Sequence, residues 1–573
     1  MKLSKRSAVL VATGVAGAMV LSACGGGSSD SGGGSSSSGS GSVTFGAPDD
    51  WPQNFLPYLS AGNVTTVQDI LGRVLPSTYI IQPDLTVKYD DELLASEPQN
   101  TVTNGVQTTT YQINPDAVWS DGEPISADDY IYTWHVSTTT DKGGCPDNLS
   151  TAGLANIGDI TGSADGKTVT VTYSSPFADW QSLFSGSQPL LPSHLMANDD
   201  PAAQCDTFAA GWATADGLPD DISGGPWQLK KENIDNGAQT VVLTPNEKYW
   251  GDKPKLERLI IQAVGSDASV QVQGLQNEEL DVVYPQPQLD LVNQIKDLEP
   301  DITSGINFGL TFEHLDFNTT DPQLSNPDVR RAFALALDRQ EIVDQTVGQF
   351  SSDAQVLDNR MYVNNQPQYQ DTAPAQYKTQ DIAGAKALLE GAGYTLGSDG
   401  LYAKGTQKLS FKIDTTQNNP LRQTTIDVMA QQLKKAGIEV TANPNADIFG
   451  GPDKPTSMNA GGFQIALFAW VSAPFVTSQV SAYQSPSRGL GTNYSRAGTP
   501  QIDALLDKLS TDLDPTQQTA DANATDALLW DQMATIPLYQ KPTFLGYRST
   551  LQNVVDNPSI QRPLWNSDDW SVK

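Results

Sequence analysis

Residue types that carry catalysis or bind metals are few and scattered in this chain of 573 residues. The three histidines, His135, His194 and His314, are isolated from one another and show no spacing typical of metal ligands. The body of the chain contains neither a Gly-x-Ser-x-Gly nor a His-Glu-x-x-His motif, which disfavours a serine hydrolase and a zinc protease. Enzymes that use a Ser/Lys pair or paired carboxylates stay open. We expect a binding protein rather than an enzyme, without metal or cofactor.

Two segments resemble catalytic motifs but are better explained as a turn and a helix cap. Gly162 to Thr168 has three residues between its glycines where a phosphate-binding loop needs four, and it leads into a strand pattern. We therefore interpret Asp165-Gly166 as a hairpin turn. Asp128 and Asp129 follow Ser126, which can cap a helix whose positive end favours carboxylates. This pair is predicted to be structural rather than a catalytic acid and base.

The first 24 residues are typical of a bacterial export signal. Three cations among the first six residues precede an apolar stretch, Ala8 to Val20, that is too short to span a membrane permanently. The stretch ends in Leu21-Ser22-Ala23-Cys24, which resembles the lipobox of bacterial lipoproteins. An ordinary signal peptide with an incidental cysteine is the alternative. The resemblance implies that residues 1–23 are removed and that lipidated Cys24 anchors the protein on the extracytoplasmic face of the cytoplasmic membrane.

A flexible tether is predicted directly after Cys24. Gly25 to Ser42 contains only glycine and serine apart from Asp30, so these residues cannot collapse around a core and should behave as a flexible coil. Residues 24–42 would then hold the body of the protein roughly 20–25 Å from its anchor, by the random-coil estimate.

The composition excludes some classes of partner. The chain has 34 Lys plus Arg against 66 Asp plus Glu, a formal net charge of -32. A surface this acidic disfavours binding to nucleic acid, which needs clustered cations, and repels an anionic membrane face. Hydrophobic residues make up 38%, enough for sizeable cores and more than one lobe at this length. No segment after Val43 is apolar for the roughly 18 residues that a membrane-spanning helix needs.

Cys145 and Cys205 are the two cysteines that remain when Cys24 is acylated. An even pair in an oxidising compartment predicts a disulfide between them. Two separate buried thiols are the alternative, because sequence spacing does not show that the Cα atoms approach within about 7 Å.

The body of the chain mixes strand and helix patterns. Thr168 to Tyr173 alternates as a half-buried strand. A helix is predicted over Ile382 to Ala392, ended by Gly393, and a second over Ile426 to Ala436 that Gly437 ends before a strand. These patterns predict an α/β fold.

One long segment resembles a known family signature. Thr110 to Tyr130 contains Trp119-Ser-Asp-Gly-Glu-Pro124 followed by Ser126-Ala-Asp-Asp129. It is similar to the signature of the family 5 extracellular solute-binding proteins, in which an aromatic-x-Asp-Gly-x-Pro turn precedes a (Ser/Thr)-Ala-x-Asp helix start. This family delivers dipeptides, oligopeptides, nickel or oligosaccharides to ABC importers.

Further motifs of the same family follow in its order. They are Gly224-Gly-Pro-Trp227, Asn246-Glu-Lys-Tyr-Trp-Gly-Asp-Lys-Pro254, the strand entry from Leu275 to Val283, and Asn326-Pro-Asp-Val-Arg-Arg-Ala-Phe-Ala-Leu-Ala-Leu-Asp338 after His314-Leu-Asp-Phe-Asn318. In the last motif Asn326 suits a helix cap, Pro327 the first turn, and Val329 and Phe333 a buried stripe. Five motifs in order indicate membership far more strongly than one.

The resemblance implies a two-lobed, periplasmic-binding-protein-like α/β fold (type 2, cluster C) with an extra domain inserted in lobe one. We expect residues 43–85, 225–315 and 535–573 to form lobe one, residues 86–224 the inserted domain, and residues 316–534 lobe two. The implied function is that of a membrane-tethered binding component of an ABC importer. It would capture an oligopeptide-sized ligand by lobe closure and present it to an ABC permease.

The resemblance also implies a ligand site and restricts its ligand. Peptide-binding relatives carry an aspartate three residues after a tryptophan near the end of a lobe-two strand, where it pairs with the peptide ammonium. Here the tryptophan matches Trp470, and the third residue on is Ala473. Moreover, Lys454 to Ile502 contains no Asp or Glu but includes Arg488 and Arg496. Because a buried ammonium without a countercharge is costly, we expect a neutral or anionic ligand, either sugar-containing, lipid-linked or an N-terminally blocked peptide.

Five residues complete the predicted site. Trp470 and Phe475 could stack on sugar faces, while Ser472, Tyr483 and Asn493 could donate hydrogen bonds to the ligand. The alternative for both aromatic residues is that they are simply part of a core.

A shorter resemblance suggests another function. Asp50-Trp-Pro-Gln-Asn-Phe-Leu-Pro57 resembles an actinobacterial lipoprotein group that includes a member implicated in phosphatidylinositol mannoside and lipoarabinomannan assembly. The alternative is therefore a non-transport lipoprotein that binds or regulates envelope-glycolipid assembly.

Overall fold

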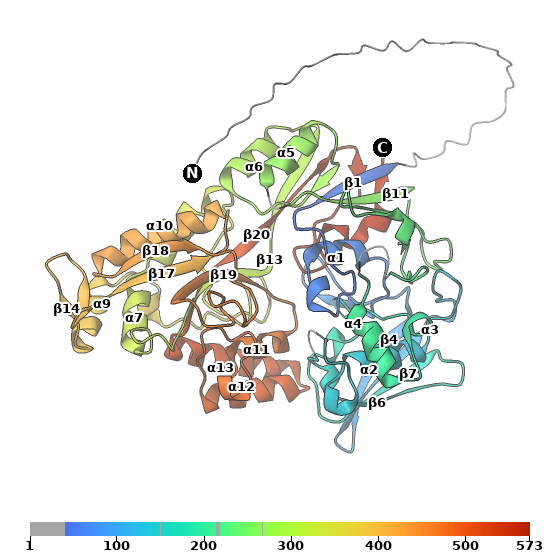
Figure 1. Cartoon of the computed structure of the whole chain (residues 1–573), viewed down its shortest axis with the longest axis horizontal. Helices are drawn as coiled ribbons and strands as arrows, with labels where there is room; N and C mark the ends of the chain where they lie inside the picture. The colour runs from blue at the N-terminus through green and yellow to red at the C-terminus, as the bar shows by residue number, and fades with distance from the viewer. Residues whose placement is uncertain (1–40, 149–150, 187, 214–217, 266) are drawn as a thin grey trace, which may run out of the picture. The chain divides into compact units, whose positions relative to one another are not determined.

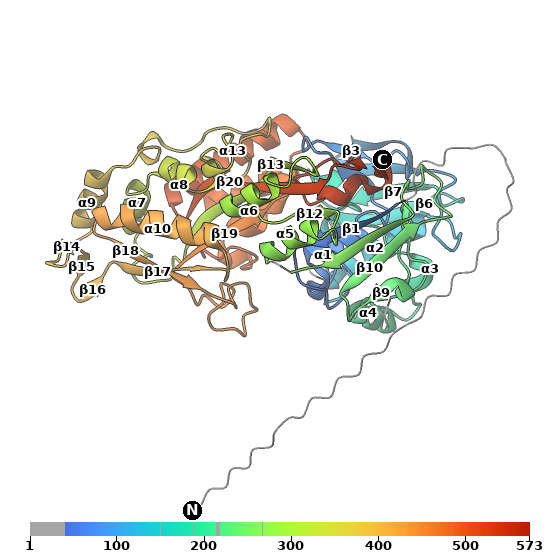
Figure 2. The same ribbon diagram turned by 90° about the horizontal axis from the view of Figure 1, so that it is seen from above.

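Two long strands cross the middle of a large mixed sheet and lie side by side in both views (Figures 1 and 2). The computed structural model describes residues 41–148, 151–186, 188–213, 218–265 and 267–573. The crossing strands, β13 (Ile302–Phe317) and β20 (Thr535–Arg548), pair antiparallel. The sheet order is β18 (Glu439–Pro444), β17 (Ser410–Thr415), β19 (Ile465–Val471), β13, β20, β12 (Val282–Val283), β1 (Ser42–Ala47), β11 (Arg258–Ala263), β10 (Thr240–Pro245) and β8 (Trp227–Gln228), with β9 (Ile234–Asp235) beside β10.

Smaller sheets accompany the large one. A separate antiparallel sheet has the order β4 (Leu94–Thr103), β5 (Val106–Ile113), β7 (Thr168–Tyr173) and β6 (Ile157–Gly162). The short pairings are β2 (Tyr79–Ile81) with β3 (Val87–Tyr89), β15 (Tyr402–Lys404) with both β14 (Thr395–Leu396) and β16 (Gln407–Lys408), and β21 (Leu551–Gln552) with β22 (Ser571–Val572).

The helices are distributed along the whole described chain. They are α1 (Thr65–Leu71), α2 (Ala127–Ser137), α3 (Ser193–Met196), α4 (Pro201–Ala210), α5 (Ala268–Gln276), α6 (Leu289–Lys296), α7 (Pro327–Leu335), α8 (Arg339–Gln345), α9 (Ile382–Gly391), α10 (Pro420–Lys435), α11 (Val480–Tyr483), α12 (Pro500–Thr511) and α13 (Pro515–Gln532). Within the described part of the chain, no helix is both long and apolar enough to cross a membrane.

The predicted turn and helix cap are confirmed. β6 and β7 pair antiparallel around the Asp165-Gly166 turn, where Gly166 has φ of +72°. Ser126 caps α2, and the Asp129 carboxylate accepts the Ser126 backbone N–H in return. Asp129 also accepts hydrogen bonds from Trp119 Nε1 and from the backbone N–H and hydroxyl of Ser193. Its oxygens are thus engaged in holding the fold.

The predicted helix ends also agree with the structure. Asn326 caps α7 through the backbone N–H of Asp328, and Pro327 occupies the first turn. Gly437 ends the α10 segment with φ of +77°, and β18 follows two residues later. This close succession is possible because glycine adopts positive φ without steric cost. At the start of the body, Ser42 belongs to β1 rather than to the tether in which we expected it.

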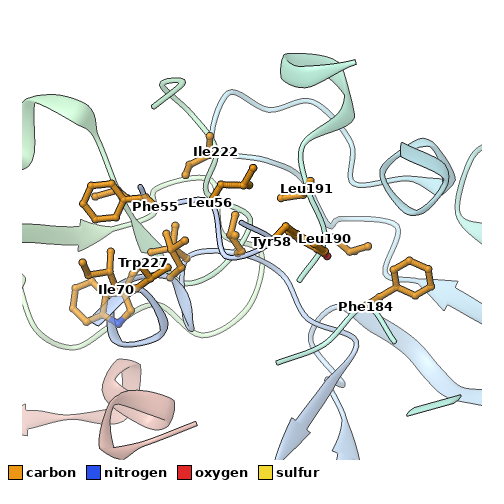
Figure 3. Close-up of a cluster of buried hydrophobic side chains, with 14 of the residues drawn as sticks. Phe55, Leu56, Tyr58, Ile70, Phe184, Leu190, Leu191, Ile222 and Trp227 are labelled. Atoms are coloured by element: carbon orange, nitrogen blue, oxygen red, sulfur yellow. The ribbon is translucent and has the colours of Figure 1, made fainter. Parts of the chain in front are cut away.

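Two large hydrophobic cores are built from separate parts of the chain. The first takes side chains from residues 43–284 and 545–572, the second from residues 315–539. Figure 3 shows part of the first core, where Phe55, Leu56 and Tyr58 lie among Leu190, Leu191, Ile222 and Trp227. Residues from the predicted inserted domain, 86–224, share this first core with β1 and β11. The domain boundaries themselves remain predictions.

The pairing of the crossing strands has two register shifts, and the larger one lies between Phe308 and Phe312. Phe308 pairs with Pro542 and Phe312 with Gln540, so residues 309–311 bulge opposite Lys541. The bulge separates the segment of β20 that pairs with β12 from the segment of β13 that pairs with β19. A Cβ atom built on Gly309 would lie 1.7 Å from the Pro558 carbonyl oxygen, so this close approach requires glycine.

A disulfide joins Cys145 to Cys205 in α4, with 5.2 Å between their Cα atoms. It ties the loop after α2 to a helix 60 residues later. The predicted signal peptide, Cys24 and nearly all of the tether lie outside the described residues.

Candidate functional site

A cavity of about 220 Å³ opens where residues of the first core meet the loop after β19. Tyr58, Tyr79 and Phe177 contribute aromatic rings from the first core, and the loop after β19 contributes Phe475. The described lining residues are Pro57, Tyr58, Asn63, Tyr79, Ile81, Val87, Asn148, Ala152, Phe177, Ser182, Ser185, Gly186, Gln188, Ala473, Phe475, Thr477, Ser478, Ile560 and Gln561. Apolar rings with a few amides and hydroxyls are typical of sites that bind small molecules.

Hydrogen bonds hold the aromatic residues on both sides of the cavity. The hydroxyl of Tyr58 donates a 2.7 Å hydrogen bond to the Pro189 carbonyl oxygen, and the backbone near Tyr58 is embedded in the first core (Figure 3). Phe475 immediately precedes the short 3₁₀ helix Val476–Gln479, and its carbonyl oxygen accepts a hydrogen bond from the Ser478 hydroxyl. Both Tyr58 and Phe475 are therefore held in place by hydrogen bonds to other parts of the structure.

Among the described residues that line the cavity, none carries a charged side chain. The nearby carboxylate of Asp179 accepts the Thr477 backbone N–H at 2.7 Å and Gln518 Nε2 at 2.9 Å. Burial raises the pKa of Asp179, and these hydrogen bonds oppose the shift. The cavity thus offers hydrogen bonds and apolar surface, but no described countercharge in its lining.

Trp470 lies at the end of β19, three residues before Ala473. Its ring stacks on His314 with 5.7 Å between centroids and on Tyr494 with 5.8 Å, and Phe468 adds an edge contact at 5.1 Å. These aromatic neighbours pack against the indole ring of Trp470, and Trp470 is not part of the described cavity lining. Phe475 is therefore better placed than Trp470 to contact a ligand.

The remaining predicted site residues have internal partners or are buried. The Ser472 hydroxyl accepts a hydrogen bond from Gln479 Nε2, and Tyr483 is buried beside Met361 and Ile502. The Asn493 amide donates to the carbonyl oxygens of Gln484 and Ala497. The structure thus brings Ala473 and Phe475 into the cavity, and it does not bring Trp470, Ser472, Tyr483 or Asn493 there.

The two arginines in the segment without acidic residues are also engaged. Arg488 pairs with Asp507 at 2.5 Å, and Arg496 donates hydrogen bonds to the Met458 and Asn459 carbonyl oxygens. Neither arginine is in the described lining. Neither arginine of this acid-free segment therefore adds a positive charge to the described lining of the cavity.

Sequence reasoning missed the wall formed by Tyr79, Phe177 and Gln561. These residues are far apart in the sequence and belong to elements that no motif marks as ligand-binding. Tyr58 follows directly on the Asp50–Pro57 segment that we had singled out only for its resemblance. The Asp50–Pro57 segment was therefore the one sequence feature that pointed to this part of the cavity lining.

A buried ion cluster lies on the crossing strands beside the bulge. Arg422 at the start of α10 donates to both oxygens of the Glu313 carboxylate, at 2.9 to 3.2 Å. Lys541 Nζ lies 3.9 Å from the same carboxylate. Coulomb attraction to Arg422 and Lys541 outweighs burial and lowers the pKa of Glu313.

The histidines do not assemble a metal site. His194 contacts Asp121, with Nε2 2.9 Å from Oδ2, and the Nε2 atom of buried His314 lies 3.4 Å from Asp316 Oδ1. Over the described residues, no group of three or more His, Cys, Asp or Glu side chains could hold a metal ion.

Comparison with known proteins identifies the family. Residues 81–490 match the bacterial extracellular solute-binding proteins, family 5 Middle. The chain belongs to this family. Our identification from the sequence motifs is therefore confirmed, and so is the class to which the motifs assigned the protein, an extracellular solute-binding protein of the type that serves ABC importers.

Individual relatives agree with this assignment. The chain is 29% identical over 516 residues to the oligopeptide-binding protein OppA of Mycobacterium tuberculosis, covering 88% of this chain and 80% of the relative. It is 26% identical over 426 residues to the probable monoacyl phosphatidylinositol tetramannoside-binding protein LpqW of Mycobacterium tuberculosis, covering 68% and 63% respectively.

The fold is confirmed by a solved structure. The periplasmic EDTA-binding protein EppA superposes with a TM-score of 0.84 at 28% identity, covering 93% of this chain and 98% of that one. The present chain therefore has the two-lobed, mixed α/β fold of family 5, in which β13 and β20 cross between the lobes.

Proposed function

We propose that this protein is the membrane-tethered, extracytoplasmic binding component of an ABC importer. It captures a small, uncharged ligand in the cavity lined by Tyr58 and Phe475 and presents the closed form to an ABC permease. The observation that carries this proposal is a cavity whose aromatic and uncharged lining comes from both sides of the crossing strands. A ligand that touches both walls stabilises the closed form by its greater affinity for that form.

The lining also narrows the class of ligand. Ala473, which the sequence motif matches to the aspartate of peptide-binding relatives, lines the cavity. An ammonium group placed there would lose its hydration without gaining a countercharge from the described lining. The hydroxyls of Ser182 and Ser185 and the amides of Gln188 and Gln561 instead suit the neutral polar groups of sugars or blocked peptides.

Native mass spectrometry of the protein purified with its bound molecule would identify the ligand. Titration calorimetry with di- to pentapeptides, their N-acetylated forms and neutral oligosaccharides would then rank ligand classes. We expect Phe475→Ala to weaken binding of the best ligand roughly tenfold, the loss of an aromatic contact. Phe449→Ala is the matched control, because Phe449 is 50% exposed and absent from the described lining.

Two outcomes would refute this proposal. One is micromolar binding of a free peptide that disappears when its amino terminus is acetylated. The other is ligand binding that stays unchanged in Phe475→Ala, which would remove the cavity from the site.

A second function is favoured by one specific observation, the similarity to LpqW. In that case the protein would bind or regulate components of envelope-glycolipid assembly without transport. Deletion of the gene distinguishes the two: uptake of the identified ligand falls under the importer proposal, whereas glycolipid composition changes with uptake intact under the alternative.

A further inference from the structure

A short segment that follows β7 reaches from the first core to α12, α13 and the loop after β19, whose buried side chains form a separate cluster. The backbone N–H of Ala178 donates a 2.9 Å hydrogen bond to the carbonyl oxygen of Ser510 at the end of α12. The adjacent Asp179 carboxylate accepts the Thr477 backbone N–H and Gln518 Nε2 from α13. Three hydrogen bonds from two residues thus join parts of the chain that otherwise build separate cores.

The carboxylate is well suited to this contact. Asp179 is only 9% exposed, and each of its oxygens accepts one of the two donors. A carboxylate can accept on both oxygens at once, whereas an asparagine would turn an N–H toward one of the donors. Hydrogen bonds to an ionised acceptor are also stronger than neutral ones. Burial raises the pKa of Asp179, consistent with a group withdrawn from water on this contact.

The contact adjoins the cavity directly. Phe177, two residues before Asp179, lines the cavity from the first core, and Thr477, whose N–H Asp179 accepts, lines it from the loop after β19. Opening the cavity by moving these two walls apart would break all three hydrogen bonds. Keeping the bonds would hold Phe475 and Thr477 in place as a wall.

We propose that Asp179 is a positioning residue that latches the cavity shut. Through Thr477 and Gln518 it holds the loop after β19 against the first core, and so contributes to the free-energy difference between the open and closed forms. This inference rests on the proposed function, because holding the cavity closed affects function only if the cavity binds a ligand. Its test, however, needs no ligand, so the two ideas can fail separately.

Hydrogen exchange of the full chain tests the latch. We expect Asp179→Ala to speed exchange of the Thr477 amide roughly tenfold or more, the effect of losing a hydrogen bond to a charged group, and also to speed exchange of residues 57–63 on the first-core wall. Asp179→Asn, which keeps one acceptor, should give a smaller effect at both places. Asp159→Ala, which removes an exposed carboxylate on β6, is the matched control and should change neither.

The exchange pattern separates a latch from a local cap. Faster exchange confined to Thr477, with residues 57–63 unchanged, would overturn the proposal. Unchanged exchange at both places would overturn it as well. Protection in β7 reports whether a variant remains folded. If Asp179→Ala does not fold, Gln518→Leu removes one partner while keeping the carboxylate, and it should speed exchange on both walls by a smaller factor.

Discussion

At the scale of single residues, Lys541 is an ionisable group placed where its charge is costly. It lies opposite the bulge of β13, and its side chain is 17% exposed. Burial lowers the pKa of Lys541 to about 8, Glu313 opposes this shift, and Arg422 adds to it. The cluster therefore combines one carboxylate with two basic groups: Glu313 and Lys541 lie on the crossing strands, and Arg422 lies on α10.

This arrangement predicts a pH-dependent stability. Between the folded pKa of about 8 and the ordinary value of 10.5, the unfolded chain binds more protons at Lys541 than the folded chain does. The free energy of unfolding should therefore rise with pH across this window because of Lys541, by something on the order of 1–3 kcal/mol. Urea unfolding at pH 7 and pH 10 measures the rise.

The variant Lys541→Met should lose this rise, because it has no group that titrates there. Lys508→Met, which changes an exposed lysine on α12, is the matched control and should keep the rise. Equal pH dependence in Lys541→Met and the unmodified chain would contradict the shifted pKa.

At the scale of elements, the bulge in β13 depends on a close backbone approach. A Cβ on Gly309 would lie 1.7 Å from the Pro558 carbonyl oxygen, and neither backbone can move away cheaply. We expect Gly309→Ala to lower the free energy of unfolding by about 1–3 kcal/mol, the usual cost of overpacking. Chemical denaturation measures this change.

The same strand provides the control for this prediction. Gly305 also lies in β13, and a Cβ built there meets no atom within 4 Å. Gly305→Ala should change the free energy of unfolding by less than about 0.5 kcal/mol. Similar losses in the two variants would show that the strand, and not the approach to Pro558, is sensitive to substitution.

The Cys145–Cys205 disulfide links the loop after α2 to α4 and closes a loop of 60 residues. Because it restricts the unfolded chain, we expect Cys145→Ser with Cys205→Ser to lower the free energy of unfolding by about 2–4 kcal/mol. Denaturation of the double variant and of the unmodified chain, both without reductant, measures this loss. An unmodified chain that keeps its full stability when reduced would contradict the prediction.

At the scale of the whole molecule, the predicted lipidation of Cys24 would determine where the protein works. If Cys24 is acylated and residues 24–42 form a tether, the body stays at the membrane while its lobes remain free to move. We expect Cys24→Ala to release the protein from the membrane fraction, and mass analysis of the unmodified protein to show a lipid-modified mature N-terminus at Cys24. A Cys24→Ala protein that still sediments with membranes would rule out lipid anchoring.

Local patterns were sufficient for the elements and for the family. The Ser126 cap, the Asp165-Gly166 turn and the α7 start at Asn326 and Pro327 depend on residues within a few positions of one another. Their side chains satisfy backbone groups nearby, so their physics can be derived from short stretches of sequence. The family signature combines such local features in a fixed order, which is why it was recognised without a structure.

The site depended on contacts that no local pattern encodes. Ala473 and Phe475 reach the cavity, but Trp470 stacks on His314 and Tyr494 from other parts of the chain, and Asn493 holds its own loop. Aromatic and amide side chains serve equally well in a core, a loop brace or a binding wall, so residue type alone does not separate these roles. Only packing between distant segments does.

The sequence by itself determined the α/β class and the order of the motifs, and it predicts an export signal followed by a tether. Tertiary structure decided which aromatic rings line the cavity, that its described lining is uncharged, and that Asp179 spans from the first core to the loop after β19 and to α13. The physical reason is the sequence distance over which each kind of interaction acts. Caps, turns and periodicity act over a few residues, whereas Tyr58, Phe177 and Phe475 form one surface only after the crossing strands bring the two halves of the chain together.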